Sequence, residues 1–154
     1  MNYIIDGHNL IPALGLQLDS LDDEQLLVSR LQEFARLHRA HVEVYFDGAL
    51  PEHARTLQAG TVKVHFIRRG STADAAIEKR LEKLERTSRN WAVVSSDRRV
   101  QVAARAAHAA VLASDEFTRL MITARVKGAE RLRDEAQPDP KDTEEWLRIF
   151  NKRD

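Results

Sequence analysis

The chain has 154 residues and no cysteine, and 43% of its residues are apolar while 31% are charged. This length suits one cored domain, and the composition excludes both an intrinsically disordered protein and one embedded in a bilayer. No apolar run reaches the roughly 20 residues of a membrane span, and Asp6 interrupts the N-terminus before a signal-peptide core could form. Without cysteine there is no disulfide framework and no thiolate zinc site. We therefore expect a cytoplasmic protein that does not contact a membrane.

The formal charge is balanced, with 24 basic and 24 acidic residues, but it is unevenly distributed. Residues 1–30 hold five acids and one base (net −4), and residues 134–154 hold seven acids and four bases (net −3). Residues 63–105 hold eleven bases and five acids (net +6). Such an excess is typical of a surface that binds a polyanion, and it is equally typical of a solvated helix face. The charge pattern alone leaves both interpretations open.

Short apolar segments rich in β-branched residues alternate with longer segments of helical periodicity. This alternation predicts an α/β fold, with helices covering a mostly parallel sheet. The first half predicts a strand at residues 3–5, a helix at about 22–38 and a second strand at 42–46. Residues 51–58 indicate a short helix or an irregular segment. A third strand at 62–67 alternates apolar and polar residues, so one of its sides faces water or lies at a sheet edge.

The second half continues the same alternation. A helix is predicted at 71–89, where Ser71 and Asp74 have the spacing of a capping box. A fourth strand follows at 91–94, and Ser96 or Asp97 can cap an alanine-rich helix that ends near residue 109. A fifth strand is predicted at 110–112.

The C-terminal part is predicted to leave the domain. A helix is expected at 115–125, and residues 127–143 combine glycine, prolines and charges in the manner of a linker. A last short helix is expected at 143–150. We thus divide the chain into a domain at residues 1–126 and a linker with a C-terminal helical tail at residues 127–154.

Four aspartates stand where predicted strands end. Asp6 and Asp47 directly follow a strand, Asp97 follows one after two serines, and Asp74 opens the helix after the third strand. The carboxyl ends of parallel strands meet at one edge of a sheet, so these side chains should converge. Each also has a structural interpretation. The Asp-Gly pairs could be turns, Asp74 could belong to a capping box, and Asp97 could be a helix N-cap.

Converging carboxylates repel one another unless a cation lies among them. Oxygen ligands without cysteine favour Mg²⁺ or Mn²⁺, which suits phosphoryl chemistry. Glu78 lies four residues after Asp74 on the predicted helix, so it faces the same edge and is either a further ligand or a surface residue paired with a neighbouring lysine.

Four blocks of the sequence together resemble a known family. They are Ile4-Ile5-Asp6-Gly7-His8-Asn9-Leu10-Ile11, Val44-Tyr45-Phe46-Asp47, Ser71-Thr72-Ala73-Asp74 with Glu78, and Val93-Val94-Ser95-Ser96-Asp97. In their order and spacing they are similar to the YacP-like group of NYN domains, which are PIN-like nucleases. The similarity covers about residues 1–125. It implies a PIN-like three-layer sandwich and an endoribonuclease dependent on Mg²⁺ or Mn²⁺, in a group that includes a ribosome-dependent mRNA endonuclease.

The resemblance also implies site residues. Asp6, Asp74 and Asp97 correspond to the metal-binding acids, with Asp47 as a fourth ligand and Asn9 as the residue that orients the first acid. Hydrolysis by such a site produces 5′-phosphate and 3′-hydroxyl ends. The RNA would be mRNA, and the ribosome is an implied partner.

Basic residues flank two of the predicted strand ends and are candidates for contacts with RNA phosphates. They are Arg68, Arg69, Arg98 and Arg99. The same arginines could be ordinary surface residues, and His8 could touch substrate. The alternative to an enzyme is an RNA- or ribosome-binding module of the same fold, whose basic middle region does the binding. Four acids at one edge argue against it, because unpaired acids repel RNA.

Overall fold

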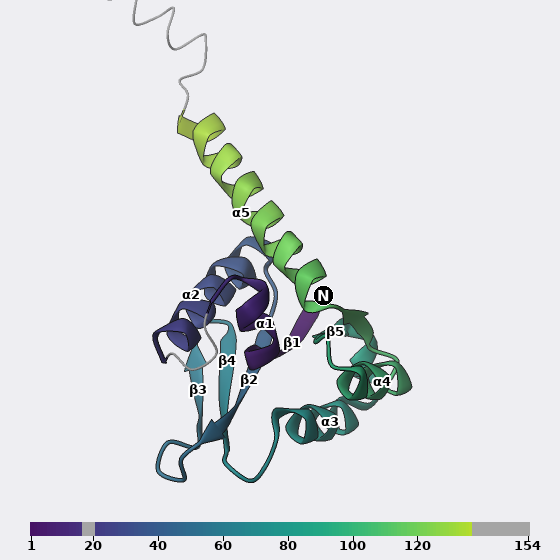
Figure 1. The fold of residues 1–154 in the computed structure, drawn as a ribbon. Helices are drawn as coiled ribbons and strands as arrows, with labels where there is room; N and C mark the ends of the chain where they lie inside the picture. The colour runs from purple at the N-terminus through teal and green to yellow at the C-terminus, as the bar shows by residue number, and fades with distance from the viewer. Residues whose placement is uncertain (17–20, 137–154) are drawn as a thin grey trace, which may run out of the picture.

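The computed structural model describes residues 1–16 and 21–136, and a six-stranded sheet runs through its middle (Figure 1). The strand order is β3-β4-β2-β1-β5-β6. All neighbouring strands are parallel except β3 and β4. The strands are β1 (Asn2–Asp6), β2 (Val42–Ala49), β3 (Arg55–Ala59), β4 (Val62–Arg68), β5 (Trp91–Val94) and β6 (Ala110–Leu112).

Helices cover both faces of this sheet, so the predicted α/β three-layer arrangement is confirmed. One face packs against α1 (Gly7–Ala13), α2 (Leu21–His38) and α5 (Ser114–Ala136). The other packs against α3 (Ala73–Leu84) and α4 (Arg98–Ala106), which lie together in Figure 1. Within the described residues no helix is long and apolar enough to cross a membrane.

The central strand β1 is buried on both sides, which explains its continuous apolar sequence. Tyr3 and Ile5 face the layer of α1, α2 and α5, where the rings of Tyr3, Phe34 and Phe117 pack at centroid distances of 4.9–5.3 Å. Ile4 faces α3 and α4. Because β1 lies between β2 and β5, the residue that ends it is placed in the middle of the sheet's carboxyl edge.

The expectation of a helix or irregular segment at residues 51–58 was wrong over its second half. Residues 55–59 form β3, an antiparallel edge strand on β4. All but the last of its residues are exposed, so the alternation that marks a half-buried strand is absent from its sequence. For residues 62–67 the expectation of a side that faces water is confirmed, since Lys63 is exposed between buried Val62 and Val64, but the sheet edge itself is formed by β3.

One helix was not expected from the sequence, and both ends of another differ from the expectation. Gly7 does not form a turn with Asp6 but begins α1, where Leu10 and Ile11 are buried. The N-cap of α3 is Thr72, whose hydroxyl accepts the N–H of Ala75 at 3.1 Å, so the capping box expected from Ser71 and Asp74 is not formed. The α-helix ends at Leu84, and residues 85–90 form a 3₁₀ helix instead of its last turn.

The end of β2 is irregular, and this irregularity matters for the site. The pairing of β2 with β4 shifts register between Phe46 and Ala49, and Gly48 has a φ of +80°. Asp47 and Gly48 therefore lie in a bulged strand end and not in a turn that closes the strand. A positive φ of this kind suits glycine, which has no Cβ to clash.

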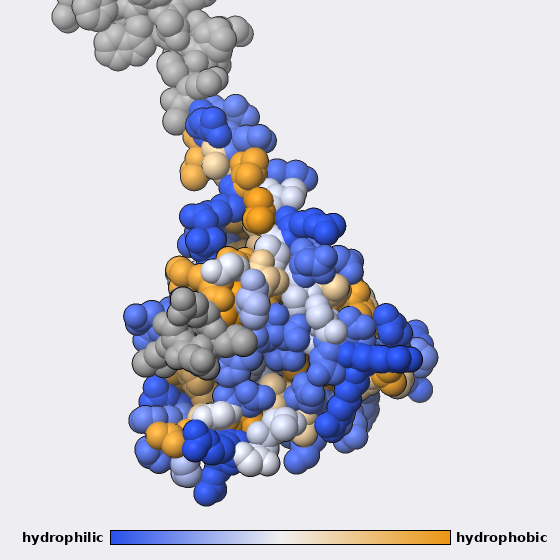
Figure 2. Space-filling model, viewed as in Figure 1, coloured by the Kyte–Doolittle hydropathy of each residue, from blue (hydrophilic) through white to orange (hydrophobic). Residues whose placement is uncertain are grey.

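The helix α5 continues to Ala136, so the linker predicted from residue 127 is absent over residues 127–136. Gly128, taken as a linker signal, is inside this helix, where an added Cβ would lie 3.0 Å from Leu37 of α2. Figure 2 shows apolar side chains along the part of α5 that projects from the sheet, and Ile122, Val126 and Leu132 are exposed there. Residues 137–154, including the predicted helix at 143–150, lie outside the described residues.

Candidate functional site

The acids predicted to converge do interact in the folded chain. Asp6 ends β1, Asp47 lies in the bulged end of β2, Asp74 is in the first turn of α3, and Asp97 precedes α4. Besides burial, the charges of Asp74 and Asp47 raise the pKa of Asp6. Besides burial, the charges of Asp97, Asp47 and Glu78 raise the pKa of Asp74. The sheet thus brings all five acids to its carboxyl edge, although residues 6 and 97 are far apart in sequence.

Asp6 is the most buried of these acids, with 8% of its surface exposed. Burial, followed by the charges of Asp74 and Asp47, raises the pKa of Asp6 to about 6. Two hydrogen bonds oppose this rise, one donated by the Ser95 hydroxyl over 3.4 Å and one by the backbone of Asn9. A buried carboxyl beside two others is strained when it is ionised, and a bound cation would relieve that strain.

Asp74 is under the same kind of strain. Burial and then the charge of Asp97 raise its pKa, Arg99 opposes them, and Asp47 and Glu78 add to the rise. Because Thr72 caps the helix, the Asp74 carboxylate is free of the capping role that its position suggested.

Asp97 has the structural role that the sequence left open. Its Oδ1 accepts the backbone N–H of Arg99 at 2.8 Å and so caps α4. Its own backbone N–H donates to the Ser95 hydroxyl at 3.0 Å. The cap engages one carboxylate oxygen, so capping and metal binding by Asp97 are compatible.

Glu78 and Arg99 are bound to each other. The Arg99 Nε and Nη2 atoms donate to the two Glu78 oxygens at 2.8 and 3.3 Å. Glu78 was predicted as a further metal ligand or a paired surface residue and Arg99 as a phosphate contact, and in this arrangement each is the other's partner. Arg68, Arg69 and Arg98 are exposed. They lie at the end of β4, in the segment after it and at the start of α4.

Asn9 connects three segments at the same edge. Its Oδ1 accepts the backbone N–H of Ser96 at 2.7 Å and the hydroxyl of Ser114 at 2.6 Å. Its backbone, and not its side chain, donates to Asp6. The Asn9 side chain therefore holds the segment that carries Asp97 next to the start of α5. The sequence did not indicate this role.

A contact between His8, Asp47 and Glu24 was also missed. His8 Nδ1 lies 3.0 Å from Asp47 Oδ1, and His8 Nε2 lies 3.3 Å from Glu24 Oε1. The pKa of His8 is raised, chiefly by the hydrogen bond to Glu24, against the effect of burial and with further help from Asp47. Only the position of His8 beside Asp6 hinted at this contact, because the placement of Glu24 depends on how α2 packs.

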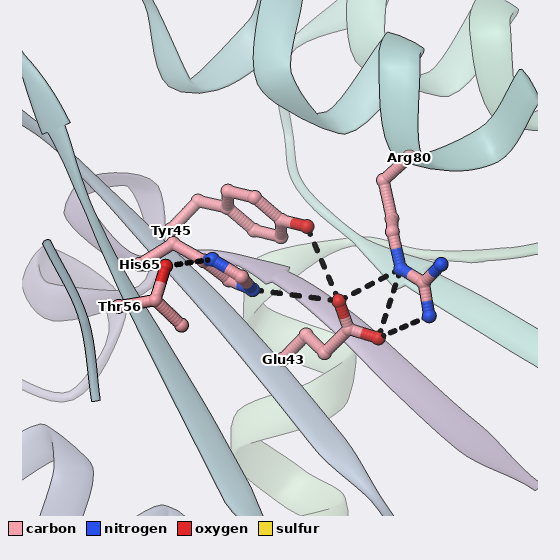
Figure 3. A network of polar contacts seen from close by, with 5 residues as sticks. All are labelled: Glu43, Tyr45, Thr56, His65 and Arg80. Atoms are coloured by element: carbon pink, nitrogen blue, oxygen red, sulfur yellow. Dashed lines mark hydrogen bonds and ion pairs between the residues drawn. The ribbon is translucent and has the colours of Figure 1, made fainter. Parts of the chain in front are cut away.

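A second charged cluster lies on the face of the sheet that packs against α3 (Figure 3). Glu43 is buried and accepts from Arg80 through both oxygens at 2.9–3.0 Å, while the Tyr45 hydroxyl donates to it at 3.2 Å. His65 Nε2 lies 3.5 Å away at ion-pair distance, without hydrogen-bond geometry, and its Nδ1 meets Thr56. Burial alone would raise the pKa of Glu43, but His65 and Arg80 lower it to about 2. The Glu43–Arg80 ion pair thus connects β2 to α3.

The acids at the edge fit a hard divalent cation by their chemistry, because carboxylate oxygens are the donors that Mg²⁺ and Mn²⁺ prefer. Within residues 1–16 and 21–136, however, no three histidine or acidic side chains are close enough together to form a ready metal site. Burial and then neighbouring carboxylates raise the pKa values of Asp6 and Asp74, and a cation bound among these acids would offset both effects.

The comparison with protein families decides the assignment that the four sequence blocks suggested. The model of the YacP-like NYN domain matches residues 3–151. The chain belongs to this family. Membership supports a nuclease-like, RNA-related function, and nucleases of this kind generally use divalent metals.

Solved structures agree with the family assignment. The chain is similar to Rae1 (YacP) from Bacillus subtilis, with 25% identity and a TM-score of 0.73, over 99% of this chain and 93% of that one. It is equally similar to the W164L mutant of that protein, over 91% of this chain and 86% of the other. These matches confirm the PIN-like fold predicted from the sequence. Among curated proteins none matches.

Proposed function

We propose that this YacP-like NYN domain is a metal-dependent endoribonuclease that hydrolyses phosphodiester bonds of RNA, with mRNA at the ribosome as its substrate and the cytoplasm as its location. The observation that supports it most is the gathering of acids at the sheet edge, where burial and then neighbouring carboxylates raise the pKa values of Asp6 and Asp74. Acids that only supported the fold would gain nothing from this repulsion, and unpaired they would repel RNA.

Each residue at the edge has a proposed role. Asp6, Asp47, Asp74 and Asp97 would hold Mg²⁺ or Mn²⁺, with Glu78 as a further acid. When bound, the metal supplies an activated water and offsets charge that develops on the leaving oxygen. Asn9 is a positioning residue, because its side chain holds the backbone next to Asp97. His8 orients Asp47 through its Nδ1.

The exposed arginines near the edge are proposed to bind the RNA backbone. Arg68, Arg69 and Arg98 offer charge without a strong competing partner among the hydrogen bonds of the described residues. Arg99 is proposed as a phosphate contact that must first give up part of its pairing with Glu78. Phosphate contacts of this kind set affinity and register without reading sequence.

Cleavage and binding measured on the same preparations test the function. Asp74→Asn and Asp97→Asn preserve side-chain volume, and Asn caps a helix about as well as Asp. RNA, free and on translating ribosomes, is incubated with each variant in Mn²⁺, Mg²⁺ or EDTA, and the fragment ends are mapped. We expect metal-dependent cleavage with 5′-phosphate ends, which falls by several orders of magnitude in both variants while RNA affinity holds or rises.

Asp115→Asn is the matched control, since Asp115 is an exposed acid on α5 with 66% of its side chain accessible. Thermal unfolding checks that the variants are folded. Wild-type rates in Asp74→Asn and Asp97→Asn would refute the assignment of these residues. RNA binding by the wild type without cleavage in any of the metals would favour a non-catalytic RNA- or ribosome-binding module instead.

A further inference from the structure

A pocket of about 330 Å³ adjoins the acid edge and shares Asp47 with it. It is formed by the end of β2, the segment after it, the start of β3 and a residue of β4, next to the N-terminal part of α2. Figure 1 shows α2, β3 and β4 together on one side of the molecule. The volume is at the lower end of the range of small-ligand pockets, roughly 300–1,000 Å³, so it suits one small planar group.

The lining of this pocket contains a stacking surface. The Arg55 guanidinium carbon lies 6.0 Å from the centroid of the Phe66 ring. The Phe66 ring also stacks on the Phe46 ring, with a centroid distance of 5.7 Å and an interplanar angle of 24°. Phe66 is half-buried and fixed by this contact, whereas Arg55 is exposed. Aromatic rings and guanidinium planes are the surfaces on which unpaired RNA bases stack.

The backbone beside the pocket leaves room for a nucleotide. Gly48 has a φ of +80°, and a Cβ built on it would meet no atom within 4 Å. His53 also lines the pocket and adds ring nitrogens, and Leu50 adds an apolar surface that is 42% exposed. The pocket thus offers stacking, an apolar contact and polar groups, the combination typical of nucleobase sites.

The position of the pocket connects it to the reaction. Asp47 belongs to both the pocket lining and the acid edge, and its carboxylate is held by His8, whose other ring nitrogen meets Glu24. A nucleotide whose base occupies the pocket therefore has its phosphate close to the acids.

We infer that this pocket binds one unpaired base of the RNA strand, stacked on the Arg55 guanidinium that lies over Phe66, and so selects the nucleotide next to the cleaved phosphate. The inference rests on the proposed nuclease function and adds to it a source of specificity. The ligand class is a nucleobase of single-stranded RNA, and a duplex cannot present one without unpairing.

The test combines changes in the RNA with changes in the protein. In a short single-stranded RNA with a mapped cleavage site, each nucleotide near that site is replaced in turn by an abasic one, and kcat/KM is measured in Mn²⁺. At one position the wild type should lose about 5- to 150-fold, the value of one stacked base. Arg55→Ala should reduce kcat/KM on intact RNA and remove most of the penalty of the abasic nucleotide, as expected for two partners of one contact.

Three further variants make the result specific. Phe66→Leu preserves packing against Phe46 and should also reduce the penalty of the abasic nucleotide. Arg55→Lys preserves the charge but not the planar guanidinium group, so it should resemble Arg55→Ala. Arg105→Ala removes an exposed charge from the last turn of α4, outside the pocket, and should leave the abasic penalty unchanged. A full penalty in Arg55→Ala and Phe66→Leu would overturn the inference.

A binding measurement separates failure of the inference from failure of the nuclease proposal. Fluorescence anisotropy with the same oligonucleotides in Ca²⁺ needs no cleavage. Weaker binding of one abasic RNA to the wild type, but not to Arg55→Ala, would support the pocket even if no metal gave cleavage. Equal binding of all abasic RNAs would refute it even if the enzyme cleaved.

Discussion

Replacing Asp6 by Asn should stabilise the metal-free protein at neutral and alkaline pH. The pKa of Asp6 is about 6 against an ordinary value of 3.8, because the carboxyl is buried beside Asp74 and Asp47. One pKa unit corresponds to about 1.4 kcal/mol, so ionised Asp6 lowers the free energy of unfolding by about 3 kcal/mol at a pH well above 6. Asn removes this charge and can still accept the hydrogen bond of Ser95.

The pH dependence follows from the sign of the shift. As the pH falls, the folded protein takes up the proton on Asp6 before the unfolded chain does, so wild-type stability rises relative to the variant from about pH 7 to pH 4. Asp6→Asn should therefore be more stable than the wild type at pH 8, and the difference should shrink toward pH 4.

Urea unfolding in EDTA at pH 8, 6 and 4.5 measures this difference, with Asp115→Asn as a control that should change stability little. A variant that is less stable than the wild type at pH 8, or a difference that does not vary with pH, would show that burial and repulsion do not raise the pKa of Asp6 as argued. Since Asp6 is also a proposed ligand, the same variant should be inactive.

The remaining predictions concern the metal, the second charged cluster, one glycine and the arginines. Mn²⁺ should raise the wild-type free energy of unfolding by about 2.7 kcal/mol at a hundredfold excess over its Kd, and Asp6→Asn should reduce this gain. Glu43→Gln should lower that free energy by about 2–3 kcal/mol at pH 7, because Arg80 loses its partner, and the urea midpoints of variant and wild type should converge as the pH falls from about 4.5 to 2. Gly7→Ala should lower the melting temperature, since its Cβ would lie 2.4 Å from the Phe46 ring, and a cost of about 1–3 kcal/mol is expected. Replacing the four proposed phosphate contacts by alanine should flatten the slope of the logarithm of the RNA-binding constant against the logarithm of salt concentration by about 0.7 per lost contact. The four residues are Arg68, Arg69, Arg98 and Arg99. An unchanged slope would make them ordinary surface residues.

The sheet was predictable because most of its strands are short runs rich in buried apolar residues. Residues 42–46 and 91–94 have the composition of buried strands. The helical segments between the strands predict that the strands run parallel. The strand β3 was not predictable, because its sequence is almost wholly exposed and its pairing depends on β4. The helix α1 was also missed, since it begins at a glycine that reads as a turn and its burial comes from tertiary contacts.

The site divides in the same way. Asp6, Asp47, Asp74 and Asp97 could be placed at one edge from the strand ends alone, because topology brings such ends together. The partners of these acids depend on side-chain packing across distant segments. The Glu24–His8–Asp47 contact and the Glu78–Arg99 pair both join residues on separate elements. Neither leaves a signal in residue spacing.

The central place of β1 has a consequence for the order of events during synthesis. The strand is made first, yet one of its two neighbours, β5, is made only after residue 90. Until then one side of β1 lacks its backbone partner, and Asp6 lacks Ser95 and the segment of Asp97. A ribosome-bound chain that stops before β5 therefore cannot assemble the acid edge. If these acids cut RNA, the nascent protein has no competent site until β5 and Asp97 have been synthesised.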